Sequence, residues 1–155
     1  MRTLGLRAEK DCIQWALVEG SGAEPVLLND GKFAAPITYD EPKALAWYRE
    51  RIKTMVDEFK PKTVAVRYPE TYLRFKPKAP SSFYARIRIE GVIVEAAQSS
   101  GVRVETGAWA TLSSRLGSKS AKAYLESGEL RGLDLSTKPD NRREAIIAAV
   151  AGLEG

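Results

Sequence analysis

Short apolar runs, separated by polar turns, predict the strands of this chain. The runs Thr3–Ala8, Cys12–Val18 and the apolar part of Pro25–Phe33 follow one another closely, as in a three-stranded meander. Within the third run, Asn29–Gly31 has the composition of a tight turn. Thr63–Arg67 has a continuous apolar centre, Val64–Val66, which predicts a strand buried on both faces, as in a parallel sheet.

Apolar residues at helical spacing predict the helices. Glu41–Lys60 places Leu45, Tyr48, Ile52 and Met55 along one face, and Pro61 ends it. A second long helix is expected over Ser82–Ser99, capped by Ser81 or Ser82 and closed by Gly101, and dimerisation is expected there because it is apolar most of the way round. The remaining expected elements are a short strand and three helices, at Val102–Thr106, Ala108–Leu116, Ala121–Ser127 and Arg142–Leu153. Tyr68–Pro80 and Leu130–Pro139 are expected to be loops.

Composition excludes some kinds of active site but does not identify a function. A chain of 155 residues, 44% hydrophobic and 28% charged, is expected to form a single globular domain over residues 1–155. The net charge of +4 permits nucleic-acid binding but does not require it. The absence of histidine excludes histidine catalysis, and the single Cys12, expected to be buried, excludes a disulfide within the chain. No apolar run is long enough to span a membrane and no signal peptide is recognisable, so a cytoplasmic protein is expected.

The order of elements predicts a mixed α/β sheet of five strands, an antiparallel meander plus parallel strands, flanked by helices. Several segments resemble motifs of one family: Leu4–Ala8, Val64–Arg67, Arg86–Ala97, Leu116–Lys122 and Asn141–Ala148. These segments resemble those of the RuvC-type Holliday-junction resolvases, which have the ribonuclease H-like fold. The chain is also similar to a small uncharacterised bacterial family with a RuvC-like core, which implies no activity.

The resemblance places basic residues where the resolvases carry metal-binding carboxylates. The four carboxylate positions fall on Arg7, Arg67, Asn141 and Glu144, so one acid remains. Arginine has no acceptor atom and cannot bind a metal, but it can bind a phosphate or a carboxylate. We therefore expect no metal site, no cofactor and no catalytic residue. The least favoured function is a metal-dependent nuclease whose metal site is rebuilt from other acids, such as Glu9 or Asp140.

Each candidate residue has a structural interpretation beside the functional one. Glu144 can form a capping box with Asn141, and Arg7 can pair with Glu144 instead of an anion. Lys119 can contact phosphate or simply be solvated. The loop residues Arg74, Lys76 and Lys78 alternate with aromatic residues, as in single-stranded nucleic-acid binding, but such a loop can also bind a protein partner.

Two functions remain open from the sequence. The first is a catalytically inactive RuvC-like domain, a pseudonuclease, that binds DNA or RNA weakly through a basic face. Its expected nucleic-acid-binding residues are Arg7, Arg67, Arg74, Lys76, Lys78 and Lys119. The second is a protein-interaction or regulatory module with internal salt bridges at the same place. In both cases a homodimer is expected.

Overall fold

A computed structural model describes residues 1–70 and 78–154 of the chain. Its centre is a five-stranded sheet in the order β3-β2-β1-β4-β5. The strands are β1 (Arg2–Ala8), β2 (Ile13–Gly20), β3 (Pro25–Phe33), β4 (Thr63–Arg67) and β5 (Arg103–Gly107). The first three pair antiparallel, while β4 runs parallel to both β1 and β5. The predicted mixed sheet, with its meander and its parallel strands, is confirmed.

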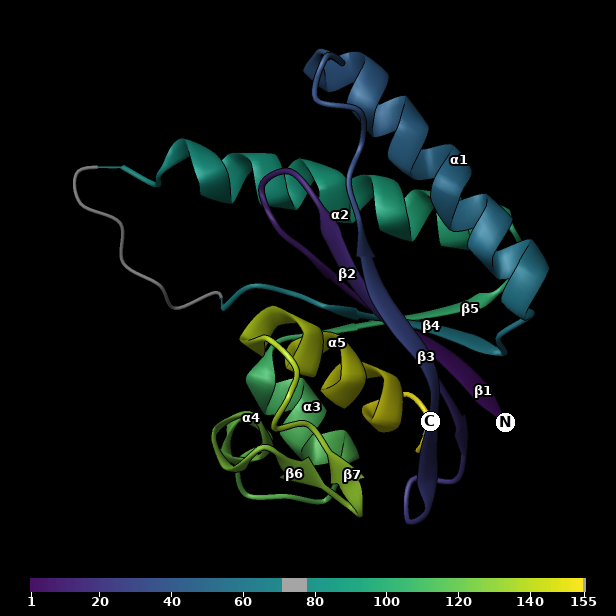
Figure 1. The fold of residues 1–155 in the computed structure, drawn as a ribbon, viewed down its shortest axis with the longest axis vertical. Coiled ribbons are helices and arrows are strands. Elements are labelled where there is room, and N and C mark those ends of the chain that lie inside the picture. The colour runs from purple at the N-terminus through teal and green to yellow at the C-terminus, as the bar shows by residue number, and fades with distance from the viewer. Residues whose placement is uncertain (71–77, 155) are drawn as a thin grey trace.

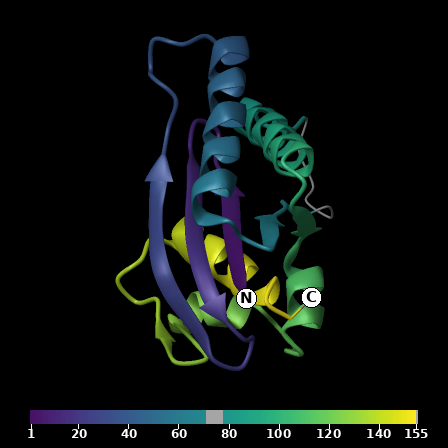
Figure 2. The same ribbon diagram turned by 90° about the vertical axis from the view of Figure 1, so that its right-hand side faces the viewer.

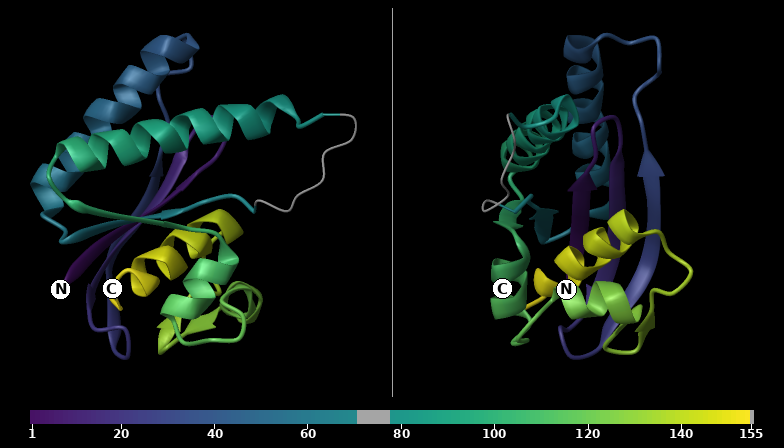
Figure 3. Two further views of the ribbon diagram at one scale, coloured as in Figure 1. Left: turned by 180° about the vertical axis from the view of Figure 1, so that it is seen from behind. Right: turned by 90° about the vertical axis from the view of Figure 1, so that its left-hand side faces the viewer.

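Helices cover both faces of the sheet (Figures 1 and 2). On one face, α1 (Glu41–Phe59) and α2 (Ser81–Ser99) pack on Leu4, Leu6 and Val66. On the other, α5 (Asp140–Ala151) packs on Ala16 and Ala65. The smaller elements lie on the same side of the sheet as α5, as the rear and side views in Figure 3 show; they are α3 (Trp109–Arg115), α4 (Lys122–Ser127), β6 (Glu129–Leu130) and β7 (Leu133–Asp134). No helix in residues 1–70 and 78–154 combines the length and the apolar character needed to cross a bilayer.

A glycine in β1 sets the position of α5. A Cβ atom at Gly5 would lie 2.0 Å from the carbonyl oxygen of Ala145, so only glycine allows this approach. Residues from Glu144 to Ala151 are all buried, which explains why α5 has no polar face of its own. The close packing of α5 on β1 brings Glu144, in the second turn of α5, to the end of the strand that carries Arg7.

Several local predictions were wrong. Asn29–Gly31 is part of a continuous β3, which pairs with β2 through a bulge between Leu17 and Val18. The predicted loop Leu130–Pro139 contains all but the first residue of the β6–β7 hairpin, whose turn has positive φ at Arg131 and Gly132.

The helix caps also differ from the predictions. The residue preceding α5 is Pro139 and the one preceding α2 is Pro80, and neither helix has a side-chain cap. Glu144 therefore does not form a capping box, and its carboxylate binds arginine instead. A proline with extended backbone angles can start a helix without a capping hydroxyl, because its own fixed φ is already close to the helical value.

Candidate functional site

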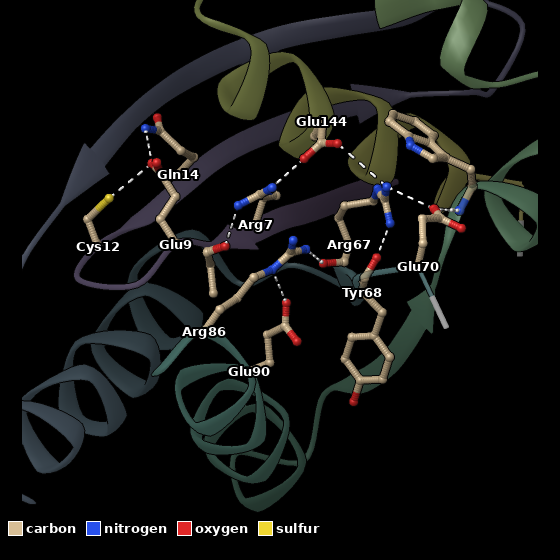
Figure 4. Close-up of polar contacts among 12 residues, drawn as sticks. Arg7, Glu9, Cys12, Gln14, Arg67, Tyr68, Glu70, Arg86, Glu90 and Glu144 are labelled. Carbon is tan, nitrogen blue, oxygen red and sulfur yellow. Dashed lines mark hydrogen bonds and ion pairs between the residues drawn. The ribbon is translucent and has the colours of Figure 1, made fainter. Parts of the chain in front are cut away.

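The carboxyl-terminal ends of β1 and β4 lie side by side and bring arginines together (Figure 4). Arg7 comes from the end of β1 and Arg67 from the end of β4. Arg86 reaches them from the second turn of α2, and Glu144 comes from α5. We refer to Arg7, Arg67, Arg86 and Glu144 as the arginine cluster.

Glu144 is the shared counter-ion of the cluster. Nε of Arg7 donates to its Oε2 at 2.5 Å, and Nη2 of Arg67 lies 3.5 Å from its Oε1. Glu144 is only 7% exposed. The pairing of Arg7 with Glu144, which the sequence left open against anion binding, is therefore present in this structure.

Arg67 is enclosed by the protein. It is 3% exposed, its Nη2 lies 3.0 Å from Oε1 of Glu70, and its guanidinium carbon is 4.1 Å from the centre of the Trp109 ring. Its Nη1 donates to the carbonyl of Tyr68. Burial lowers the pKa of Arg67, and the nearby carboxylates oppose this effect. A phosphate cannot reach this guanidinium unless the surrounding side chains move.

Arg86 completes the cluster from the helix side. Its Nε donates to Oε1 of Glu90 at 2.8 Å, and its Nη2 donates to the carbonyl of Arg67 at 3.3 Å. Burial and then the positive charge of Arg7 lower the pKa of Arg86, while burial raises the pKa of Glu90. Arg7 and Arg86 line the same cleft, so an anion bound there could contact both.

Arg7 and Arg86 also line an open cleft of about 370 Å³, which we call the arginine cleft. Its lining residues are Arg7, Glu9, Lys10, Asp11, Pro80, Ser82, Phe83 and Arg86. The side chains of Arg7 and Arg86 are 16% and 14% exposed. A ligand in this cleft would therefore meet Arg7, Arg86 and Lys10, but not Arg67.

Glu9 forms the acidic wall of the cleft and is already engaged. Its Oε2 accepts hydrogen bonds from Sγ of Cys12 at 3.0 Å and from Nε2 of Gln14 at 2.8 Å. Burial acts to raise the pKa of Glu9, but the hydrogen bonds from Gln14, Cys12 and Asn141 lower it. The pKa of the buried Cys12 thiol is raised to about 12, so this thiol stays protonated and unreactive.

The predicted site residues are only partly brought together. Arg7 and Arg67 meet at Glu144, whereas Lys119 is exposed in the turn between α3 and α4 and does not line the cleft. Lys78 is exposed just before α2, and Arg74 and Lys76 lie outside the described residues. Arg86 was missed as a member of the site, although its spacing from Glu90 fits a helical ion pair.

The carboxylates at the cluster do not fit a metal site. Glu144, Glu70 and Glu90 each pair with arginine, at 2.5, 3.0 and 2.8 Å. Within residues 1–70 and 78–154, no group of three or more aspartate, glutamate, cysteine or histidine side chains is arranged to hold a metal. Guanidinium groups occupy the space among these carboxylates and would repel a divalent cation.

Solved resolvase structures share this fold. Thermus thermophilus RuvC has a TM-score of 0.77 at 19% identity, covering 99% of this chain and 94% of that one. The same organism's RuvC in complex with a Holliday junction substrate has a TM-score of 0.75 at 17% identity, with the same coverages. The yeast mitochondrial Holliday junction resolvase has a TM-score of 0.65 at 13% identity, covering 99% and 78%. No protein-family model and no curated protein matches the sequence. The chain therefore has the RuvC-like ribonuclease H fold.

Proposed function

We propose that this chain is a pseudonuclease: a RuvC-like domain that binds nucleic acid weakly through the face that carries the arginine cleft and does not hydrolyse it. The observation that carries the proposal is the shared contact of Arg7 and Arg67 with Glu144 at the ends of β1 and β4. In the resolvases that the sequence resembles, these positions belong to metal-binding carboxylates. The solved relatives act on, or are bound to, Holliday junctions, which makes DNA the first nucleic acid to test.

Electrostatics argues against two-metal hydrolysis at this place. That mechanism needs carboxylates that hold two divalent cations about 4 Å apart. Two unit charges of like sign about 4 Å apart repel by about 4 kcal/mol at an effective dielectric constant near 20. Arg7 and Arg67 would repel an incoming metal ion in this way, while their pairing with Glu144 engages the carboxylate that the metal would use.

The same electrostatics supports binding of a phosphate without a metal. Arg7, Arg86 and the exposed Lys10 line one cleft and can donate to phosphate oxygens. Their charge is partly compensated by Glu144 and Glu90, so we expect weak binding without sequence preference. Arg74 and Lys76 add positive charge to the segment that enters α2 through Lys78.

Cleavage and binding assays test this proposal together. We expect no cleavage of four-way junction, duplex or single-stranded DNA or RNA in Mg²⁺ or Mn²⁺. We also expect binding that is unchanged by a chelator, because arginine supplies the positive charge. Cleavage that exceeds a mock preparation and disappears in Asp140→Asn, or in Glu144→Gln at a temperature where that variant is still folded, would refute the proposal and support a relocated metal site.

A second candidate function is a protein-interaction or regulatory module. The burial of Arg67 favours this second function, because an arginine that is 3% exposed and paired with Glu70 and Glu144 stabilises the fold rather than binding a ligand. Under this alternative, Arg7→Gln lowers the melting temperature and the wild type binds no nucleic acid even at low salt. Under the first proposal, Lys10→Gln weakens binding while the melting temperature is unchanged.

A further inference from the structure

A second cavity lies next to the arginine cleft, between α1, α2 and the chain that connects β3 to α1. Its volume is about 330 Å³, within the range of small-ligand sites. Its wall is mainly apolar and includes Pro36, Ile37, Leu45, Ala85 and Ile89. We call it the apolar pocket.

The apolar pocket and the arginine cleft share walls. Lys10 and Asp11, in the turn between β1 and β2, line both. Helix α2 lines both as well, with Ala85 and Ile89 on the apolar pocket and Ser82 and Arg86 on the cleft. The two hollows therefore adjoin, and we call them together the groove. One half carries Arg7, Lys10 and Arg86 beside the carboxylates of Glu9 and Asp11, and the other half is mainly apolar.

Hydrogen bonds connect the walls of the apolar half. The hydroxyl of Tyr48 donates to the carbonyl oxygen of Asp11 at 2.7 Å and accepts from the backbone N–H of Ala35 at 3.2 Å. These bonds connect α1 to the turn after β1 and to the segment after β3, so one side chain links three walls of the pocket. At the rim, Ile37 is 100% exposed, an unusual position for a large apolar side chain and one that a ligand would cover.

We propose that this groove holds one unpaired nucleotide of a single-stranded nucleic acid, with its phosphate in the arginine cleft and its base in the apolar pocket. The inference rests on the proposed function and specifies the substrate class for the same face. A nucleotide matches both halves, because it joins an anionic group to a flat ring that is stabilised by apolar contact. Arg7, Lys10 and Arg86 favour this occupant over a purely apolar peptide.

A strand without bases distinguishes the contribution of the apolar pocket to binding from that of the arginine cleft. Binding of a short oligothymidine is compared with binding of an abasic strand of the same length and charge at low salt. We expect the abasic strand to bind the wild type about tenfold more weakly, as loss of one buried base contact predicts. A short acidic peptide with apolar side chains serves as a third probe.

Variants then assign the base contact to the apolar pocket. Ala85→Phe fills the pocket. We expect this variant to bind oligothymidine about tenfold more weakly than the wild type does, and to bind the abasic strand with the same affinity as oligothymidine. Ile37→Ser shortens the exposed rim with little risk to folding, and Val26→Ser is its matched control, since Val26 is 55% exposed and lines neither hollow. Lys10→Gln should weaken the binding of oligothymidine and of the abasic strand by the same factor.

The possible failures are distinguishable. If the wild type binds both strands equally, or if the preference for bases survives in both Ala85→Phe and Ile37→Ser, the inference is overturned while nucleic-acid binding stands. If neither strand binds the wild type, the proposed function fails as well. If only the peptide binds, and Ala85→Phe abolishes that binding, the groove is a protein-docking site and both proposals are overturned.

Discussion

At the scale of single residues, Glu144 holds the arginine cluster together, and its removal should be costly. Glu144→Gln removes the charge that compensates Arg7 and Arg67, while Arg67 is 3% exposed. Loss of one partner of a buried ion pair costs about 3–5 kcal/mol, because the remaining charge is left uncompensated. Urea denaturation should show a loss of this size in the free energy of unfolding.

A matched control distinguishes this effect from the loss of an ordinary surface ion pair. Glu95 pairs with Arg49 at 2.9 Å, and its side chain is 53% exposed. Glu95→Gln should lower the free energy of unfolding far less than Glu144→Gln does, because water screens the charges of an exposed pair. Equal losses for Glu144→Gln and Glu95→Gln would contradict a structural role for the cluster.

A second residue-scale prediction concerns acid stability and Asp30. Its carboxylate accepts from Nζ of Lys138 at 2.7 Å and from Nη1 of Arg142 at 2.8 Å. Burial acts to raise the pKa of Asp30, but these hydrogen bonds and charges outweigh it and lower the pKa. A lowered pKa in the folded state means that ionised Asp30 stabilises the protein at pH values above its unfolded pKa of about 3.9.

The pH dependence of Asp30→Asn measures that contribution. The difference in unfolding free energy between wild type and variant should be constant above about pH 5, and it should shrink as the pH falls below about 3.9. Chemical denaturation at several pH values provides the comparison. A difference that stays the same down to the acid limit, or grows there, would be incompatible with the ion pairs of Asp30.

The sequence could predict part of the cluster and not the rest. The resemblance placed Arg7 and Glu144 at related positions, which was enough to raise their pairing as a possibility. Arg86 was overlooked because it comes from a helix, and nothing in sequence spacing shows how far a long side chain reaches across a sheet edge. The capping function assigned to Glu144 was wrong because Pro139 starts α5 earlier and places Glu144 in its second turn.

At the scale of elements, α2 presents a stripe that fits a second helix. Tyr84, Ile87, Gly91 and Val94 recur at spacings of three and four, and Tyr84 and Ile87 are 42% and 37% exposed. A Cβ atom at Gly91 would meet nothing within 4 Å, so another backbone has room to approach there. The sequence predicted dimerisation through this helix, and the stripe identifies the surface that would be covered.

Substitutions on this stripe test the dimer. We expect light scattering to give twice the 17.1 kDa chain mass for the wild type and for Val26→Glu, which changes an exposed residue of β3. Ile87→Glu and Gly91→Arg should give the mass of one chain, because each places a charge on the apolar stripe. A wild type that remains a monomer over a wide concentration range would refute this prediction.

The elements themselves follow from periodicity where tertiary contacts agree with local preference. Thr63–Arg67 was predicted with its observed bounds, because its continuous apolar centre fits a central strand, and all five residues are buried in the structure. Asn29–Gly31 was misread as a turn. Asp30 is held in β3 by Lys138 and Arg142, which are distant in sequence, so tertiary contacts override the local turn preference.

At the scale of the whole molecule, the order of elements was sufficient for the fold but not for the charge balance of the site. Three strands in a meander, followed by two strands joined through α1 and α2, leave few arrangements other than the observed β3-β2-β1-β4-β5. Whether Arg67 is exposed depends on Trp109 and Glu70, which follow two different strands. That packing is a property of the folded chain and has no local sequence pattern.

The salt dependence of nucleic-acid binding tests how the molecule uses its charge. With a net charge of +4, we expect about three to five phosphate contacts. Each contact should add about −0.7 to −0.9 to the slope of the logarithm of the binding constant against the logarithm of the salt concentration. Lys10→Gln should lower the magnitude of the slope by about one contact. Lys62→Gln should leave the slope unchanged, because Lys62 is an exposed lysine outside the arginine cleft.

Arg67→Gln should lower the melting temperature and leave the slope intact, because this buried guanidinium acts within the fold. A flatter slope for Arg67→Gln at an unchanged melting temperature would mean that Arg67 reaches the phosphate and that the cluster opens on binding.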